Sequence, residues 1–371
     1  MKKLISLISL LAAAACSRGV ETIPAALFET EHDGRQVSLY TITGGGLTAQ
    51  VTNFGARIIS LWTPDRFGNM ADIIVGYGDI DSFINNKGER FLGANPGPVA
   101  NRIAGGSFEL NGITYSLPAN NGENTLHGGL LGLDMLVWDV TECAEDHISM
   151  SVLHPDGMDG FPGNTTFTIT YTLTGESAMK IEYSAISDQD TPINLAHHGF
   201  FNLRGCGNGD ILGHILTINA SYTTPVDAAL IPTGEIASLD GSPLDFREPH
   251  AIGERIEADD EQLHNGNGYD HNWCIDTNGE EGLCLAATVY EPRYGRVMEV
   301  HSDQPGLQFY SGNFFNGQSI DKYGKPMSYR CAMALETQKW PDAVHHSNFP
   351  DIILKAGDIY THTCTYTFKT R

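Results

Sequence analysis

The most constraining feature of the sequence is a strict alternation of apolar and polar residues. Residues 166–174 read Thr-Phe-Thr-Ile-Thr-Tyr-Thr-Leu-Thr, and after a turn at 175–177 the alternation resumes at 179–185. Successive side chains of a strand point to opposite faces, so each segment has one apolar and one polar face. Together they predict an antiparallel hairpin with one face in the core and the other in water.

The same alternation recurs at 296–301 and 361–368, whereas only 251–257 suggests a short helix. Only 18% of the residues are charged and 41 are glycines, which is typical of strands joined by many turns. No linker or change of composition divides the chain after about residue 25. The pattern therefore predicts an all-β protein, with one large antiparallel β-sandwich domain at 26–371.

The charge balance excludes several partners. The chain has 22 Lys and Arg against 45 Asp and Glu, a net charge of −23. Nucleic-acid affinity depends on Lys and Arg that neutralise phosphates, so a nucleic-acid partner is not expected. A polybasic membrane-surface patch is excluded for the same reason.

The N-terminal residues predict an export segment. Lys2 and Lys3 precede an apolar stretch at 4–11 and a run of alanines that ends at Cys16. As a helix this stretch is too short to cross a bilayer, so 1–15 are interpreted as a signal peptide. The alanine run before Cys16 resembles a bacterial lipobox, whose cysteine is acylated.

This interpretation makes 16–25 a short tether and predicts an envelope lipoprotein on the periplasmic or outer-membrane side. Simple cleavage after Ala15 with release of a soluble periplasmic or secreted protein is the alternative. Removal of Lys2 and Lys3 with the signal peptide leaves the mature chain with a net charge of 20 − 45 = −25.

Six cysteines remain after Cys16, and none of them belongs to a Cys-x-x-Cys motif. Zinc-ribbon and thioredoxin-type sites are therefore not indicated. Export permits one or two disulfides, whereas buried free cysteines are common in β cores, so the pairing stays open.

Four positions carry side chains suited to proton transfer or ligand binding. His127 precedes two glycines that leave room beside its ring, and only one of the neighbours His197 and His198 can face a given site. Asp270 is close in sequence to two aromatic residues, and Glu336 directly follows an apolar run, where burial would raise its pKa. Each of these residues could instead be structural. The histidines lack the spacing of an HExxH zinc site, so no metal is expected.

An ordered set of motifs from Ile23 to Lys369 resembles the aldose 1-epimerase (galactose mutarotase) family. The motifs are Asn53-Phe54-Gly55-Ala56, Val99-Ala100-Asn101-Arg102-Ile103-Ala104, Leu126-His127-Gly128-Gly129, Asp156-Gly157, Gly160-Phe161-Pro162-Gly163-Asn164, His198, Phe201-Asn202-Leu203, Leu230-Ile231-Pro232-Thr233-Gly234, Asp245-Phe246-Arg247, Tyr269-Asp270-His271-Asn272, Gly306-Leu307-Gln308-Phe309-Tyr310, Leu335-Glu336-Thr337-Gln338 and Asn348-Phe349-Pro350.

The resemblance implies a mutarotase-like supersandwich with a shallow sugar cleft and no metal or nucleotide cofactor. It implies that Glu336 is the general base and His198 the general acid. The residues that it assigns to the sugar hydroxyls are Asn101, Arg102, His127 and Asp270. The expected partner is a small sugar, and the expected assembly is a monomer or a dimer.

These residue types suit the interconversion of α and β anomers. Opening the ring requires one group to remove the proton of O1 while another protonates the ring oxygen O5. The aldehyde then turns about its C1–C2 bond and closes on the other face. A carboxylate and an imidazolium that titrate near neutrality would serve both directions.

The chain departs from the family pattern at three places. His197 stands where asparagine is usual, Pro98 where an arginine is common, and Met135-Leu136 where a polar or basic pair is frequent. None of these is the predicted acid or base, so the departures affect the choice of sugar, which the sequence leaves open.

Two other function classes remain as alternatives. A glycoside hydrolase would use two carboxyl groups about 5–10 Å apart, and Asp270 with Glu336 are the candidates. A sugar-binding lipoprotein would bind without catalysis.

Overall fold

The long alternating segments form a nine-stranded antiparallel sheet in the computed structural model, which describes residues 20–85, 88–277, 279 and 282–371. Its strands, in spatial order, are β11 (Asp139–Cys143), β12 (His147–His154), β13 (Thr165–Thr174), β14 (Ala178–Ser187), β26 (Ile359–Thr370), β22 (Arg296–Ser302), β21 (Cys284–Tyr290), β16 (Ile215–Ile218) and β19 (His250–Ala251). Strands β13 and β14 pair from Thr165–Ser187 to Thr174–Ala178, which confirms the predicted hairpin.

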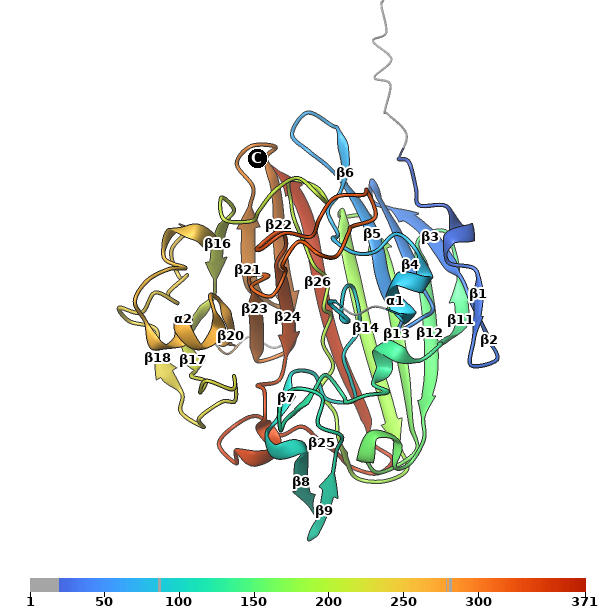
Figure 1. The fold of residues 1–371 in the computed structure, drawn as a ribbon, viewed down its shortest axis with the longest axis vertical. Helices are drawn as coiled ribbons and strands as arrows, with labels where there is room; N and C mark the ends of the chain where they lie inside the picture. The colour runs from blue at the N-terminus through green and yellow to red at the C-terminus, as the bar shows by residue number, and fades with distance from the viewer. Residues whose placement is uncertain (1–19, 86–87, 278, 280–281) are drawn as a thin grey trace, which may run out of the picture.

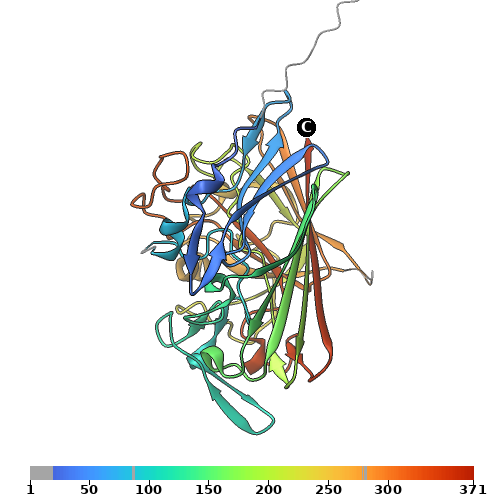
Figure 2. The ribbon, with the colours of Figure 1, turned by 90° about the vertical axis from the view of Figure 1, so that its right-hand side faces the viewer.

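Two smaller antiparallel sheets pack against the same face of this large sheet (Figures 1 and 2). One contains β3 (Leu39–Gly44), β4 (Leu47–Thr52), β5 (Arg57–Pro64) and β6 (Met70–Asp72), and the other contains β18 (Ala237–Ser238), β17 (Ala220–Thr224), β20 (Asp270–Ile275), β23 (Gly306–Tyr310) and β24 (Ala334–Gln338). Side chains from all three sheets form one continuous apolar cluster. The predicted all-β sandwich is therefore confirmed.

The remaining elements are short. The small strands are β1 (Thr30–His32), β2 (Arg35–Val37), β7 (Arg102–Ile103), β8 (Ser107–Leu110), β9 (Ile113–Ser116), β10 (Thr125–Leu126), β15 (Thr191–Pro192) and β25 (Ile353–Leu354). The helices found in the described part of the chain are α1 (Ile80–Ile84), α2 (Glu261–Gly266) and six single 3-10 turns at Ala25–Leu27, Ala104–Gly106, Leu133–Met135, Met158–Gly160, Ile252–Glu254 and Ala343–His345. None of the helices within the described ranges is long and apolar enough to span a membrane.

The helix suggested at 251–257 was wrong, because that segment holds only the 3-10 turn Ile252–Glu254 after β19. The sequence also failed to predict α1 and α2. Each is preceded by an N-cap aspartate, Asp79 or Asp260, whose carboxylate accepts a backbone N–H of the first turn. Helices this short lack the length for a clear 3.6-residue period.

The six cysteines after Cys16 are unpaired, and five of them are buried while Cys143 is exposed. The structure thus selects buried free thiols from the two alternatives. The predicted signal peptide at 1–15 and lipid attachment at Cys16 lie outside the described residues, as do residues 16–19 of the tether 16–25.

Strand register determines which side chains meet in the second small sheet. Residue Gln308 of β23 lies opposite Glu336 of β24, and Tyr310 lies opposite Asp270 of β20. Residues that are paired, or two apart on one strand, share a face, so Asp270, Gln308 and Glu336 project from the same side. This sheet therefore supplies the two carboxyl groups of a single site.

Candidate active site

A cavity of about 240 Å³ lies above β20, β23 and β24. Its lining residues are Gly88, Glu89, Arg90, Phe91, Asn101, Arg102, Leu126, His127, His198, Asp270, Tyr310, Phe314 and Glu336. All six residues that the sequence assigned to catalysis or sugar binding are among them. Residues that span more than 230 positions of the chain thus converge on one small cavity.

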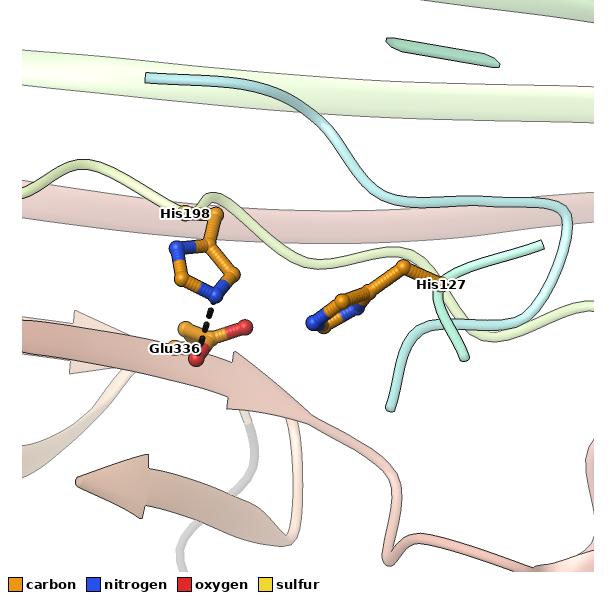
Figure 3. Close-up of side chains that lie close together, drawn as sticks. All are labelled: His127, His198 and Glu336. Carbon is orange, nitrogen blue, oxygen red and sulfur yellow. Dashed lines mark ion pairs between the residues drawn. The ribbon is translucent and has the colours of Figure 1, made fainter. Parts of the chain in front are cut away.

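Glu336 and His198 face each other inside the cavity. Nε2 of His198 lies 3.5 Å from Oε1 of Glu336, and both side chains are buried. Figure 3 shows the rings of His198 and His127 directed towards the Glu336 carboxyl. The second carboxyl oxygen of Glu336 and Nδ1 of His198 have no hydrogen-bond partner among the described residues. Buried polar atoms are normally hydrogen-bonded, so these atoms are available to a ligand.

Two backbone bridges hold the segment that carries His198. Its N–H donates to the carbonyl of Ala94 (2.8 Å), and Phe201 pairs with Met333, just before β24. The prediction that only one of the two neighbouring histidines can face the site is confirmed. His197 instead points into the core, 3.4 Å from Oδ1 of Asn95.

His127 is fixed by the backbone of the Asn-Arg motif. The Asn101 N–H donates to Nδ1 of His127 (3.1 Å), and the His127 N–H donates to the carbonyl of Asn101 (2.9 Å). A neutral imidazole that accepts at Nδ1 carries its proton on Nε2. His127 therefore presents an N–H donor to the cavity.

The glycines after His127 are required by close backbone packing. A Cβ on Gly128, whose φ is 88°, would lie 1.9 Å from the carbonyl oxygen of Gly97. Both His127 and Asn101 themselves adopt left-handed φ values, 52° and 60°. Such strained residues often occur at functional sites, where the surrounding structure holds them in place.

The two charged groups among the residues assigned to sugar hydroxyls are anchored by amides. Nε of Arg102 donates to Oδ1 of Asn121 (3.0 Å), while Oδ1 of Asp270 accepts from Nε2 of Gln308 (2.7 Å). The side chain of Asn101 accepts the N–H of Arg102 (2.9 Å), so it supports Arg102 from within the wall. These contacts fix one cation and one anion at the cavity before any ligand binds.

Burial shifts the site towards its neutral forms. It raises the pKa of Glu336 well above its usual range, and Asp270 and Glu89 add to this rise while Arg102 opposes it. Burial lowers the pKa of His198 to about 3. The sequence predicted the raised pKa of Glu336, whereas its expectation that His198 titrates near neutrality was wrong, because the ring is desolvated.

The ligand atoms of His127, His198 and Glu336 lie within 4.8 Å of one another, close enough for a metal ion. The hydrogen bond from Asn101 fits this poorly, because it leaves the proton on Nε2 of His127. A metal at Nε2 would need the other tautomer, which would turn two N–H groups towards each other. The donor set suits a hydroxylic ligand better than an ion.

The sequence missed several lining residues. Tyr310 lies in one of the motifs, and pairing that motif with the strands of Asp270 and Glu336 would have found it. In contrast, Glu89, Arg90 and Phe91 belong to no motif, although the Phe91 ring centroid lies 4.5 Å from that of His127.

Positive charge is present near the site although Pro98 stands where an arginine is common in the family. Arg57 and Arg90 both bind the buried Asp134, and Arg90 does so through two contacts of 2.7 Å. Met135, another departure, is half-buried and packs against an apolar cluster.

Comparison with known proteins agrees with this geometry. The sequence model of the aldose 1-epimerase family matches residues 38–367. The chain is 39% identical to galactose mutarotase of Bos taurus over 333 residues, which cover 90% of this chain and 94% of the relative. It is 32% identical to aldose 1-epimerase of Escherichia coli over 339 residues, which cover 91% and 96%.

Solved structures show the same fold. A GalM/aldose epimerase homologue from C. elegans aligns with a TM-score of 0.83 and 29% identity, covering 90% of this chain and 99% of that one. Galactose 1-epimerase from Lactobacillus acidophilus aligns with a TM-score of 0.79 and 27% identity, covering 92% and 97%. Because the family model and the relatives span most of the chain, this protein belongs to the aldose 1-epimerase family.

Proposed function

We propose that this aldose 1-epimerase interconverts the α and β anomers of free aldohexoses such as galactose and glucose, with Glu336 as general base and His198 as general acid. The observation that carries the proposal is the contact between the two groups, whose nearest atoms lie 3.5 Å apart in a cavity lined by Arg102 and Asp270. The relatives named galactose mutarotase make galactose the first substrate to test.

In this mechanism a proton leaves one sugar oxygen as another arrives. Glu336 removes the proton of O1 while His198 protonates O5, and the C1–O5 bond breaks to give the open aldehyde. After rotation about C1–C2 the ring closes, with each group reversing its role. His127 donates its Nε2–H to a sugar oxygen, and Arg102 and Asp270 hold hydroxyls through charge-assisted hydrogen bonds.

The pair of Glu336 and His198 must hold one proton for this reaction. In the empty site, burial favours a protonated carboxyl beside a neutral ring. Transfer of that proton to the ring gives the carboxylate and imidazolium of the proposed roles, and the charge of Arg102 stabilises the carboxylate. Sugar hydroxyls add hydrogen bonds that favour the same charged state.

Polarimetry tests the function directly. Fresh α-D-galactose or α-D-glucose should reach its equilibrium rotation faster when the protein is added, in proportion to protein concentration. Saturable sugar binding without acceleration would instead support a sugar-binding protein. Release of reducing ends from oligosaccharides would support a hydrolase, an alternative that no observation in the described site favours.

The charges around Glu336 predict opposite pH shifts for two variants. Arg102 lowers the pKa of Glu336 and Asp270 raises it. Activity ends at high pH when Glu336 loses the shared proton. We therefore expect Arg102→Met to move the basic limb of the kcat/KM profile to higher pH, and Asp270→Asn to move it to lower pH. The acid limb should lie well below 6.5 in all three proteins, because burial lowers the pKa of His198.

Profiles of initial mutarotation rate against pH, measured at sugar concentrations below KM, check this expectation. Shifts of both variants in the same direction would contradict the assignment of the basic limb to Glu336.

We also propose that the enzyme is exported, with residues 1–15 removed, Cys16 acylated and 16–25 tethering the catalytic domain 26–371 to the envelope membrane. The basic start, the apolar stretch and the alanine run before Cys16 support this proposal. Acyl chains on Cys16 would insert into the bilayer, and each methylene group buried there would add to the affinity for the membrane.

Fractionation of a bacterial host and mass measurement of the N-terminal peptide test the anchor. We expect lipid on Cys16 and loss of membrane association in Cys16→Ser. A soluble protein that begins at Cys16 and carries no lipid would contradict the anchor and support cleavage with simple secretion.

A further inference from the structure

Glu89 lies in the wall of the sugar cavity, although no motif contains it. It shares that wall with Gly88, Arg90 and Phe91. Glu89 also lines a neighbouring cavity of about 240 Å³, together with Gly88 and Phe314. Its side chain therefore stands where the catalytic cavity meets the adjoining one.

The segment that carries Glu89 is held in place from two sides. Oε1 of Glu89 accepts the N–H of Phe91 (3.0 Å). Next to it, Arg90 binds Asp134 through two contacts of 2.7 Å and donates to the carbonyl of Gly129 (2.9 Å). These contacts fix the wall before a sugar binds, which lowers the ordering cost of using Glu89 as a ligand.

Glu89 also lies within electrostatic range of the other two acids. It raises the pKa of Glu336, while burial raises the pKa of Glu89 itself and Asp270 adds to that rise. The charged and titratable groups that line the cavity with Glu336 are Glu89, Arg90, Arg102, His127, His198, Asp270 and Tyr310. Three carboxyl groups thus line one cavity that must hold a ligand rich in hydroxyl donors.

We propose that Glu89 is a specificity-determining residue of the sugar site, whose carboxyl group accepts a hydrogen bond from one hydroxyl of the bound aldose. This inference rests on the proposed function. A site that hydrogen-bonds a hydroxyl rejects the analogue without it, because a buried polar group then stays unpaired. Glu89 would therefore select aldoses that carry that hydroxyl, in addition to the selection made by Arg102 and Asp270.

The variant Glu89→Gln tests this role with little change in shape. Its amide oxygen can still accept the Phe91 N–H, but the strong acceptor for the sugar is lost. For galactose we expect KM to rise about tenfold to a hundredfold while kcat changes less than about threefold, because hydrogen bonds to charged groups contribute about that much. Polarimetry over a range of sugar concentrations separates the two constants.

The deoxy sugars identify the hydroxyl and separate binding from structural damage. Wild type and Glu89→Gln are compared on galactose and on its 2-, 3-, 4- and 6-deoxy analogues. For the one analogue that lacks the partner hydroxyl, the wild type is already weakened and the variant should show no further loss. The control is Glu109→Gln, the same change at an exposed position of β8, which should match the wild type on every sugar.

Two outcomes would overturn the inference. One is an unchanged KM of Glu89→Gln on every sugar, and the other is a loss by the same factor on galactose and all four analogues, which indicates a structural fault. Failure of the wild type to accelerate mutarotation of any sugar would refute the proposed function instead.

Discussion

Replacing Glu336 with glutamine should lower kcat for galactose mutarotation by about 10²–10⁴-fold, the usual contribution of a positioned general base. The amide has nearly the same shape, so the buried side chain keeps its packing. The amide cannot accept a proton from O1. It also cannot share a proton with His198, as the carboxyl group does in the proposed mechanism. The free energy of unfolding should change little or rise, because the variant no longer buries an ionisable carboxyl.

Polarimetry of initial rates at saturating sugar gives kcat, and urea unfolding gives the free energy of unfolding. Glu299→Gln on the outer face of β22, where Glu299 is half-buried and pairs with Lys369 far from the cavity lining, is the control and should retain full activity. His198→Asn should lose a similar factor. Because both residues act in one proton transfer, the double variant should lose much less than the product of the two losses. Wild-type kcat in Glu336→Gln would show that another group is the base.

The sequence predicted the large sheet well because its strands have one wet face. Strand β13 buries Phe167, Ile169, Tyr171 and Leu173 in strict alternation, so the period of two is visible in the sequence. In β20, β23 and β24 every residue is buried, and the alternation disappears. Strands covered on both faces carry no such pattern, so the motifs rather than the periodicity located the site.

What the sequence could not predict is the pairing that assembles the site. Asp270 meets Gln308, and His127 receives a hydrogen bond from Asn101, through contacts between distant segments. The desolvation that lowers the pKa of His198 likewise depends on what packs around the ring. Such properties arise from tertiary packing, which local sequence does not encode.

Pro98 gives a sharper example of this limit. A proline stands there in place of an arginine that is common in the family, so this position lacks one positive charge. In the structure, Arg57 and Arg90 both bind Asp134, although neither lies in a motif. Arg57 and Asp134 have no exposed side-chain surface, and burial lowers the pKa of Arg57 to about 10. The buried carboxylate of Asp134 is thus paired with two arginines from other positions of the chain.

Replacing Asp134 with asparagine should therefore lower the free energy of unfolding by about 3–5 kcal/mol, the cost of leaving a buried charge without its partner. The guanidinium of Arg57 would keep its contacts with the carbonyls of Arg90 and Leu92 but lose its counter-charge. Arg90 would lose both of its strong contacts, so the wall that carries Phe91 would loosen beside His127. Urea unfolding at neutral pH measures the loss, and KM for galactose should rise with it.

The surface pair of Asp139 with Arg35 provides the matched control. Asp139 is 77% exposed, and exposed ion pairs contribute about 1 kcal/mol or less, so Asp139→Asn should unfold near the wild-type urea concentration. The comparison measures the effect of burial, because each substitution removes a carboxylate that is paired with arginine, one in the core and one at the surface. An equally small loss in Asp134→Asn would mean that Arg57 is stabilised by its backbone carbonyl contacts alone. The double variant Asp134→Asn with Arg57→Met separates the effects, since removing the buried cation should restore part of the lost stability.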